Sequence, residues 1–270
     1  MTEIDRELDT VWTTIGGLSI HARISRRRAT GVPAVVLVHG VGVSGRYMLP
    51  TAGRLTPFFP TYVPDLPGFG KSEKPGHILD IPELADALAA WMRAMQLANA
   101  CLVGNSLGCQ TIVDLALRYP ELIGWAVLVG PTVDSRARTL PRQLGRGALD
   151  MLGEPLGYWP LLLWEYLRSG PIRTIVTLRH GLQDPLTAKL PQVRVPTLVV
   201  RGSCDPIAPQ PWCEEMVRLL PLGRLLVIAG ATHVPNYTRP DALTKAIREF
   251  LTRCPSSAVN PAKIYQPAVE

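Results

Sequence analysis

Short apolar runs alternate with amphipathic stretches along most of the chain. Residues 34–38 are continuously apolar and rich in β-branched side chains, as expected of a strand buried on both faces of a sheet. Residues 82–97 instead place apolar side chains at helical spacing, with Leu84, Leu88 and Met92 on one face. This alternation predicts an α/β fold whose mostly parallel sheet is covered by helices on both sides.

The same pattern predicts eight strands, of which the first two form a hairpin around Gly16 and Gly17. The expected strands cover residues 11–15, 18–24, 34–38, 61–64, 100–103, 125–129, 197–200 and 225–229. The expected helices cover residues 82–97, 107–119, 212–220 and 241–253. Strands and helices therefore alternate before residue 132 and again after residue 192.

The alternation is interrupted between residues 132 and 192. This segment has no strong strand pattern but contains helical stretches, prolines and an aromatic-rich patch. It predicts a helical cap, or lid, inserted after the sixth strand into a core formed by residues 1–131 and 193–254. Residues 255–270 are rich in proline and small side chains, which predicts a flexible C-terminal tail.

Composition and charge narrow the possible partners. No apolar run approaches the roughly 18 residues needed to cross a bilayer, so we expect no membrane partner. The net charge of +6 is modest and the basic run Arg26-Arg27-Arg28 is short, so we expect no nucleic-acid partner. Residues 1–7 lack an apolar stretch behind a basic start, so we expect no secretory signal and a cytoplasmic location.

Cysteine and histidine spacing gives no indication of a metal or an organic cofactor. The five cysteines are odd in number and show no CxxC pair, so we expect free thiols. The five histidines do not cluster, and no dinucleotide fingerprint is present. We therefore expect no cofactor and no metal, and a small-molecule substrate as the partner of a monomer or homodimer.

The segment Gly104-Asn105-Ser106-Leu107-Gly108 carries the strongest chemical signal. It lies between an expected strand and an expected helix, which is the setting of a nucleophile elbow with the pattern G-x-S-x-G. Small residues two positions before and after the serine let a tight turn pass close to its neighbours. The pattern predicts a catalytic serine, with an ordinary strand-to-helix turn as the alternative.

Two further loops follow expected strands at the same edge of the sheet, where sites in α/β folds collect. His233 follows strand 225–229, and its imidazole is suited to take a proton from Ser106 near neutral pH. Asp205 follows strand 197–200 and is predicted to accept the Nδ1–H of that imidazole. Asp134, after strand 125–129, is the alternative acid.

The loop His39-Gly40-Val41-Gly42 directly follows strand 34–38. By its position in the motif, the backbone N–H of Val41 is predicted to form an oxyanion hole with that of Leu107. Loss of one such donor typically costs about 2.7–4 kcal/mol of transition-state stabilisation. His39 precedes the serine in the chain, so we interpret it as structural.

Together these segments resemble the α/β-hydrolase superfamily. The matching pieces occur in the family's order, between about residues 11 and 253. They are His39-Gly40, Asp65-Leu66-Pro67-Gly68-Phe69-Gly70-Lys71-Ser72, Gly104-Asn105-Ser106-Leu107-Gly108, Asp205 and His233. The resemblance implies an α/β-hydrolase fold, a catalytic triad of Ser106, Asp205 and His233, and a cap in the family's usual place. Epoxide hydrolases and haloalkane dehalogenases carry aspartate where this chain has Ser106.

Three functions are compatible with these residues. The first is a serine hydrolase that cleaves a carboxylic ester or lactone of a fairly apolar small molecule through an acyl-enzyme. Its substrate is expected to contact four aromatic residues of the cap. These are Tyr158, Trp159, Trp164 and Tyr166.

The second is a carbon–carbon bond hydrolase acting on a diketo acid ring-cleavage product. The Gly-Asn-Ser-x-Gly elbow is similar to that of such enzymes, and Arg179 is expected to bind the acidic substrate. The loop after His39-Gly40 lacks the asparagine that those enzymes usually carry. The third function is a non-hydrolytic biosynthetic enzyme or ligand receptor on the same fold.

Overall fold

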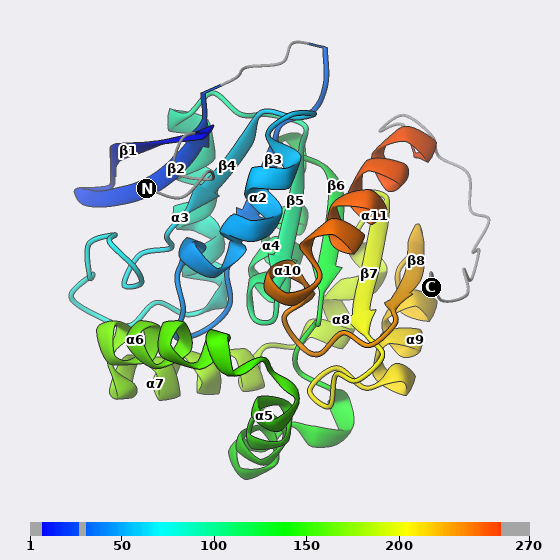
Figure 1. Ribbon diagram of the computed structural model, residues 1–270. Helices are drawn as coiled ribbons and strands as arrows, with labels where there is room; N and C mark the ends of the chain where they lie inside the picture. Colours follow the sequence, from blue (N-terminus) through cyan, green and yellow to red (C-terminus); the bar gives the residue numbers. More distant parts are fainter. Residues whose placement is uncertain (1–6, 27–30, 255–270) are drawn as a thin grey trace.

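The computed structural model describes residues 7–26 and 31–254 (Figure 1). The predicted flexible tail at 255–270, together with Arg27 and Arg28 of the basic run, lies outside the described residues. All five cysteines lie within them and are free thiols, as expected, and Cys204 is the one that is exposed.

Eight strands of the described chain form one sheet in the order β1-β2-β4-β3-β5-β6-β7-β8. The strands are β1 (Leu8–Ile15), β2 (Leu18–Ser25), β3 (Val35–Val38), β4 (Thr61–Pro64), β5 (Ala100–Asn105), β6 (Ile123–Val129), β7 (Thr197–Gly202) and β8 (Gly223–Ile228). The pairs β1–β2 and β2–β4 are antiparallel, and all other pairs are parallel. The predicted α/β-hydrolase fold with a mostly parallel eight-stranded sheet is confirmed.

Two strands extend two residues further than the apolar pattern predicts. Asn105 continues β5 because it pairs with Val129 of β6, and Gly202 continues β7 because it pairs with Ile228 of β8. Neither residue favours a strand on its own, so the neighbouring strands decide where these two end. Both extensions lie at the edge of the sheet where the candidate catalytic residues follow.

Helices cover both faces of the sheet (Figure 1). The helices are α2 (Leu49–Leu55), α3 (Ile81–Ala94), α4 (Gly108–Arg118), α9 (Gln210–Leu219), α10 (Pro235–Thr238) and α11 (Pro240–Arg253). In β3, Val35 and Leu37 pack with α2 and α11, whereas Val36 and Val38 face the side covered by α3, α4 and α9. Burial on both faces explains why the central strands are uniformly apolar.

The chain between β6 and β7 is helical and lies across the carboxyl edge of the parallel strands (Figure 1). Its helices are α5 (Leu140–Gly153), α6 (Trp159–Ser169), α7 (Pro171–Gln183) and α8 (Leu186–Lys189). Short 3-10 turns are η1 (Gly45–Met48), η2 (Pro120–Leu122), η3 (Ser135–Ala137), η4 (Leu156–Tyr158) and η5 (Leu190–Gln192). That residues 132–192 form a cap separate from the core remains a prediction.

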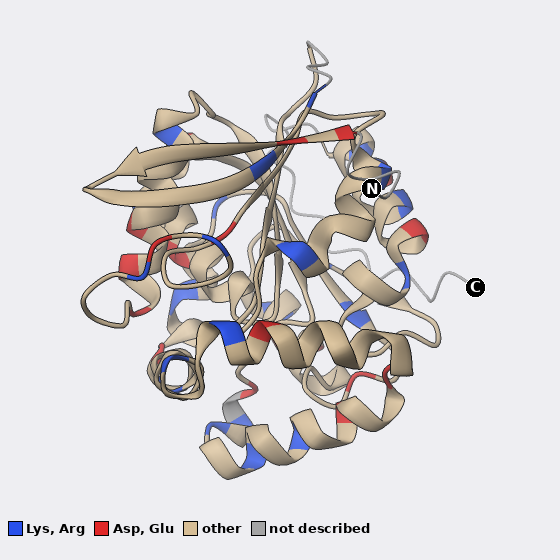
Figure 2. Ribbon diagram, turned by 60° about the vertical axis from the view of Figure 1, so that its left-hand side comes forward, with Lys and Arg blue, Asp and Glu red and all other residues tan. Residues whose placement is uncertain are grey.

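Charged residues do not gather on one element. In the view of Figure 2, Lys and Arg residues are distributed among several helices and loops, with Asp and Glu residues between them. Within the described ranges, no helix is both long and apolar enough to cross a membrane.

The loop after β4 is organised around the buried carboxylate of Asp65, which is 0% exposed. One oxygen accepts hydrogen bonds from His21 Nδ1 at 2.8 Å and from the Lys71 amide at 2.9 Å. The other accepts from the Gly45 amide at 2.8 Å. A Cβ added to Gly70 would lie 2.3 Å from this carboxylate, so the turn closes tightly only with glycine there.

We expect Asp65→Ala to lower the free energy of unfolding by about 3–5 kcal/mol at pH 7, because it leaves buried polar partners unpaired. Burial raises the pKa of Asp65, but His21 and Arg23 more than offset this, and the pKa falls below its usual value. The Asp65 carboxylate therefore contributes to the free energy of unfolding at pH values above its unfolded pKa of about 3.9. This contribution is lost as the pH falls through the pKa that Asp65 has in the folded protein.

Urea unfolding monitored by circular dichroism measures this loss. Asp9→Ala is the control, since Asp9 is half-exposed and its ion pair with Arg26 is a surface pair. Such a pair contributes at most about 1 kcal/mol. Equal losses in the two variants would contradict the structural role of Asp65.

Candidate active site

Ser106 occupies the turn between β5 and α4 with a left-handed backbone, at φ +58°. The turn is possible because two glycines flank it. A Cβ added to Gly104 would lie 2.8 Å from the backbone of Gly108. A Cβ on Gly108 would lie 2.5 Å from the carbonyl oxygen of Val38 at the end of β3. The glycines thus let the elbow pack against its neighbours and hold Ser106 at the edge of the sheet.

The structure brings the side chains of His233 and Asp205 into contact. The Nδ1 atom of His233 lies 3.0 Å from Oδ2 of Asp205, and both residues are buried. The other oxygen of Asp205 accepts hydrogen bonds from the amides of Ile207 at 2.8 Å and Ala208 at 3.0 Å. These amides fix the carboxylate, so the imidazole receives one defined orientation.

Asp134, the alternative acid, is placed differently. Its carboxylate accepts a hydrogen bond from the guanidinium of Arg146 at 2.8 Å and from the amide of Arg136 at 3.0 Å. It is buried but forms no hydrogen bond with His233. Of the two candidate acids, the geometry therefore favours Asp205.

The charges around His233 shift its titration. Burial lowers the pKa of the imidazole, but the carboxylates of Asp205, Asp150 and Glu154 together raise it to about 9. For Asp205, burial raises the pKa, whereas His233 and the amides of Ala208 and Ile207 lower it below its usual value. These carboxylates thus stabilise the imidazolium that forms when the imidazole accepts a proton.

A buried polar network joins three loops at the site. Asn105 donates from Nδ2 to the carbonyl oxygen of His233 at 3.0 Å and accepts at Oδ1 from the hydroxyl of Tyr47 at 2.7 Å. The same hydroxyl accepts from the amide of Gly40 at 2.9 Å. The sequence pattern did not predict this network. The polar side chain of Asn105 inside the elbow motif was the one available signal, and no pattern near Tyr47 indicates a role for that residue.

The two residues predicted to supply the oxyanion donors lie in loops next to Ser106. A Cβ on Gly40 would lie 3.0 Å from Cβ of Ser106, so the loop after β3 lies directly against the serine. Over the described ranges, the amides of Val41 and Leu107 donate no hydrogen bond. Both residues line a cavity beside Ser106. Two residues whose amides have no hydrogen-bond partner thus lie at the wall of this cavity.

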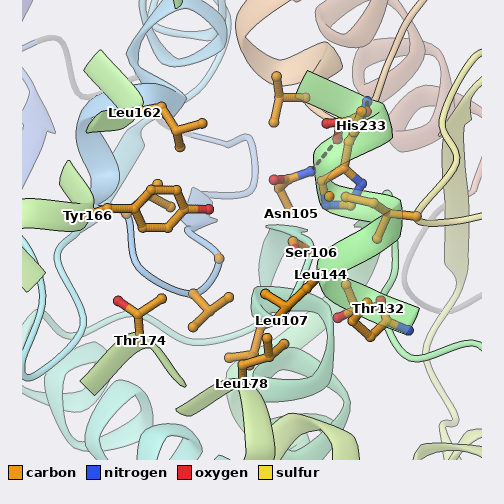
Figure 3. Close-up of a pocket in the computed structure, with 18 of the residues that line it drawn as sticks. Asn105, Ser106, Leu107, Thr132, Leu144, Leu162, Tyr166, Thr174, Leu178 and His233 are labelled. Atoms are coloured by element: carbon orange, nitrogen blue, oxygen red, sulfur yellow. Dashed lines mark hydrogen bonds between the residues drawn. The ribbon is translucent and has the colours of Figure 1, made fainter. Parts of the chain in front are cut away.

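The cavity has a volume of about 520 Å³ and a mostly apolar wall (Figure 3). Ser106 and His233 lie on one side of it, with Leu162 and Tyr166 across from them. No hydrogen bond joins the serine hydroxyl to the imidazole among the described residues. Such contacts often form only when substrate binds.

The predicted cap residues fall into two groups. Tyr158 and Tyr166 line the cavity, whereas Trp159, Trp164 and Arg179 do not. The latter three are exposed on α6 and α7. The cavity therefore does not support the predicted contact of these three residues with the substrate.

His39 has a structural setting. It is fully buried, its Nδ1 lies 2.8 Å from the carbonyl oxygen of Gly40, and its Nε2 accepts from the Leu66 amide at 2.9 Å. Within residues 7–26 and 31–254, no group of three or more Cys, His, Asp or Glu side chains is arranged to hold a metal ion.

This topology, with a serine elbow and a buried Asp–His pair beside one cavity, defines the α/β class of hydrolases. The chain belongs to the alpha/beta hydrolase family, whose model matches residues 35–246.

Curated relatives agree with this assignment. The chain is 26% identical over 264 residues to 2-(acetamidomethylene)succinate hydrolase of Mesorhizobium japonicum. This alignment covers 88% of this chain and 93% of the relative. It is 28% identical over 249 residues to a pimeloyl–acyl-carrier-protein methyl ester esterase of Xanthomonas oryzae, covering 83% and 96%. A bacterial membrane phospholipase A matches in structure with a TM-score of 0.77 at 23% identity, covering 92% of this chain and 86% of that one. At that identity the match shows the fold alone.

We expect Asp205→Asn to lower the pKa of the His233 imidazole from about 9, because it removes the charge that most stabilises the imidazolium. NMR titration of the ring nitrogens measures this shift. Asp134→Asn is the matched control and should leave that pKa nearly unchanged, since Asp134 pairs with Arg146. A shift in the control and none in Asp205→Asn would identify Asp134 as the partner.

Proposed function

We propose that the protein is a serine hydrolase that cleaves a carboxylic ester or lactone of a fairly apolar small molecule. The observation that carries this proposal is the contact between His233 and Asp205 at a cavity that Ser106 also lines. The apolar wall of the cavity favours an apolar substrate. Hydrolase and esterase names among the relatives support the same reaction class.

The mechanism follows from the position of each group. Neutral His233 removes the proton from Ser106 as its Oγ attacks the carbonyl carbon, and Asp205 stabilises the resulting imidazolium. The amides of Val41 and Leu107 hold the developing oxyanion. Collapse of the tetrahedral intermediate expels the alcohol, which takes the proton from His233. Water, activated by the same imidazole, then releases the acid from the acyl-enzyme.

The cavity does not favour the alternative functions. Among the residues that line it there is no Lys or Arg, and Arg179 lies outside it. A diketo acid would thus enter without a cationic partner. A non-hydrolytic role would leave the Asp205–His233 pair and the free amides without a use.

We expect Ser106→Ala to lower kcat/KM for ester and lactone substrates by at least about 10³-fold, because no other nucleophile replaces the hydroxyl. A fluorophosphonate probe should label the wild-type protein and spare the variant. Ser19→Ala, in β2 away from the cavity, is the control and should keep both activity and labelling.

The wild-type protein and Ser106→Ala should both be assayed with a panel of esters, lactones, thioesters and diketo acids. Fast cleavage of diketo acids with slow ester hydrolysis would reject the proposed class. Unchanged ester hydrolysis by Ser106→Ala would reject the nucleophile.

A further inference from the structure

The charged side chains around the cavity are unbalanced. Apart from His233, the ionisable side chains of its wall that carry charge near neutral pH are Asp150 and Glu154, and no Lys or Arg is among the lining residues. Asp150 belongs to α5, and Glu154 follows the last residue of that helix. They are 8% and 5% exposed. The proposed mechanism uses neither carboxylate as an acid, base or nucleophile.

No Lys or Arg forms an ion pair with Glu154 within the described chain, and the positive group that acts on its charge is the imidazole of His233. Both carboxylate oxygens are buried, and neither has a hydrogen-bond partner. Burial and then the charge of Asp150 raise the pKa of Glu154 to about 7, although Thr232, the charge of His233 and the Val234 amide act in the opposite direction. A buried carboxylate is costly unless it is paired or neutralised. A cation brought in by a ligand would remove that cost.

Asp150 has a different arrangement. One of its oxygens accepts a hydrogen bond from the backbone amide of His233 at 3.1 Å. It thereby holds the loop that carries the imidazole and adds negative charge next to Glu154. Its like charge makes ionisation of Glu154 harder when the cavity is empty, and it attracts a cation that enters.

We propose that Glu154, assisted by Asp150, binds a positively charged nitrogen of the substrate, so that the preferred ester or lactone is an apolar molecule bearing an ammonium group. This inference rests on the proposed hydrolase function. The two unpartnered oxygens of Glu154 can accept hydrogen bonds from a primary ammonium, which has three donors. The aromatic rings of Tyr158 and Tyr166 line the same cavity and suit both alkyl groups and cations.

The test compares two phenyl esters of equal shape at pH 7. Phenyl 6-aminohexanoate carries an ammonium where phenyl heptanoate carries a methyl group. We expect kcat/KM of the wild-type enzyme to be about 10-fold or more higher for the ammonium ester, the range of a charge-assisted hydrogen bond. A second pair, the acetates of 6-aminohexanol and heptanol, places the same groups on the alcohol side.

Glu154→Gln keeps the shape of the side chain and removes its charge. We expect it to reduce the ratio of kcat/KM for the ammonium ester to kcat/KM for the heptanoate to about one, while any effect through His233 changes both values equally and leaves the ratio unaffected. Glu165→Gln is the matched control, because Glu165 is also a buried glutamate of this segment but does not line the cavity. It should leave the preference intact.

Two results would overturn the inference. One is equal turnover of the two esters in both pairs by the wild-type enzyme. The other is an equal loss for charged and neutral esters in Glu154→Gln, which would show that Glu154 only supports His233. Calorimetric binding of hexylammonium and hexanol to Ser106→Ala is independent of turnover. A failed ester assay with preferential hexylammonium binding would reject the hydrolase function alone, whereas equal binding would reject the ammonium site.

Discussion

The close contact between the serine turn and the end of β3 is the constraint on which the site depends. The backbone of Gly108 passes so near the carbonyl oxygen of Val38 that a single added carbon would lie 2.5 Å from it. This contact sets where α4 begins and brings the Leu107 amide and the loop after β3 to one place. Two segments that are over 60 residues apart in the chain thus form one wall of the cavity.

Hydrogen bonds then hold the remaining loops to that wall. Asn105 occupies the last position of β5 and reaches both the His233 carbonyl and the Tyr47 hydroxyl. Because all of these atoms are buried, loss of one partner would leave the others unsatisfied in a medium of low dielectric. The catalytic geometry is therefore tied to packing of the core as much as to the residues that react.

Sequence patterns predicted the parts of the site that depend on local chain geometry. The elbow glycines, the aspartate and the histidine each follow a strand whose apolar run is easily recognised. Residues that reach the site only through tertiary packing could not be predicted from the sequence. Tyr47, Asp150 and Glu154 have no distinctive spacing and acquire roles only when distant segments meet.

The helical segment between β6 and β7 shows the same limit. Its aromatic residues share one composition, yet Tyr158 and Tyr166 line the cavity while Trp159 and Trp164 do not. Which side of a helix faces a cavity depends on how the helix packs, and the amphipathic pattern here has apolar residues on more than one side. The short helix α2 was likewise missed, since seven residues give too little periodicity.

The left-handed backbone of Ser106 has a consequence for the energetics of the whole protein. A non-glycine residue in that conformation costs roughly 1–3 kcal/mol, which the surrounding packing must overcome. Glycine would adopt it without that cost. Replacement of Ser106 by glycine would relieve this strain but remove the nucleophile, so selection for stability alone would not retain serine at this position. Catalysis and folding make opposite demands at this one position.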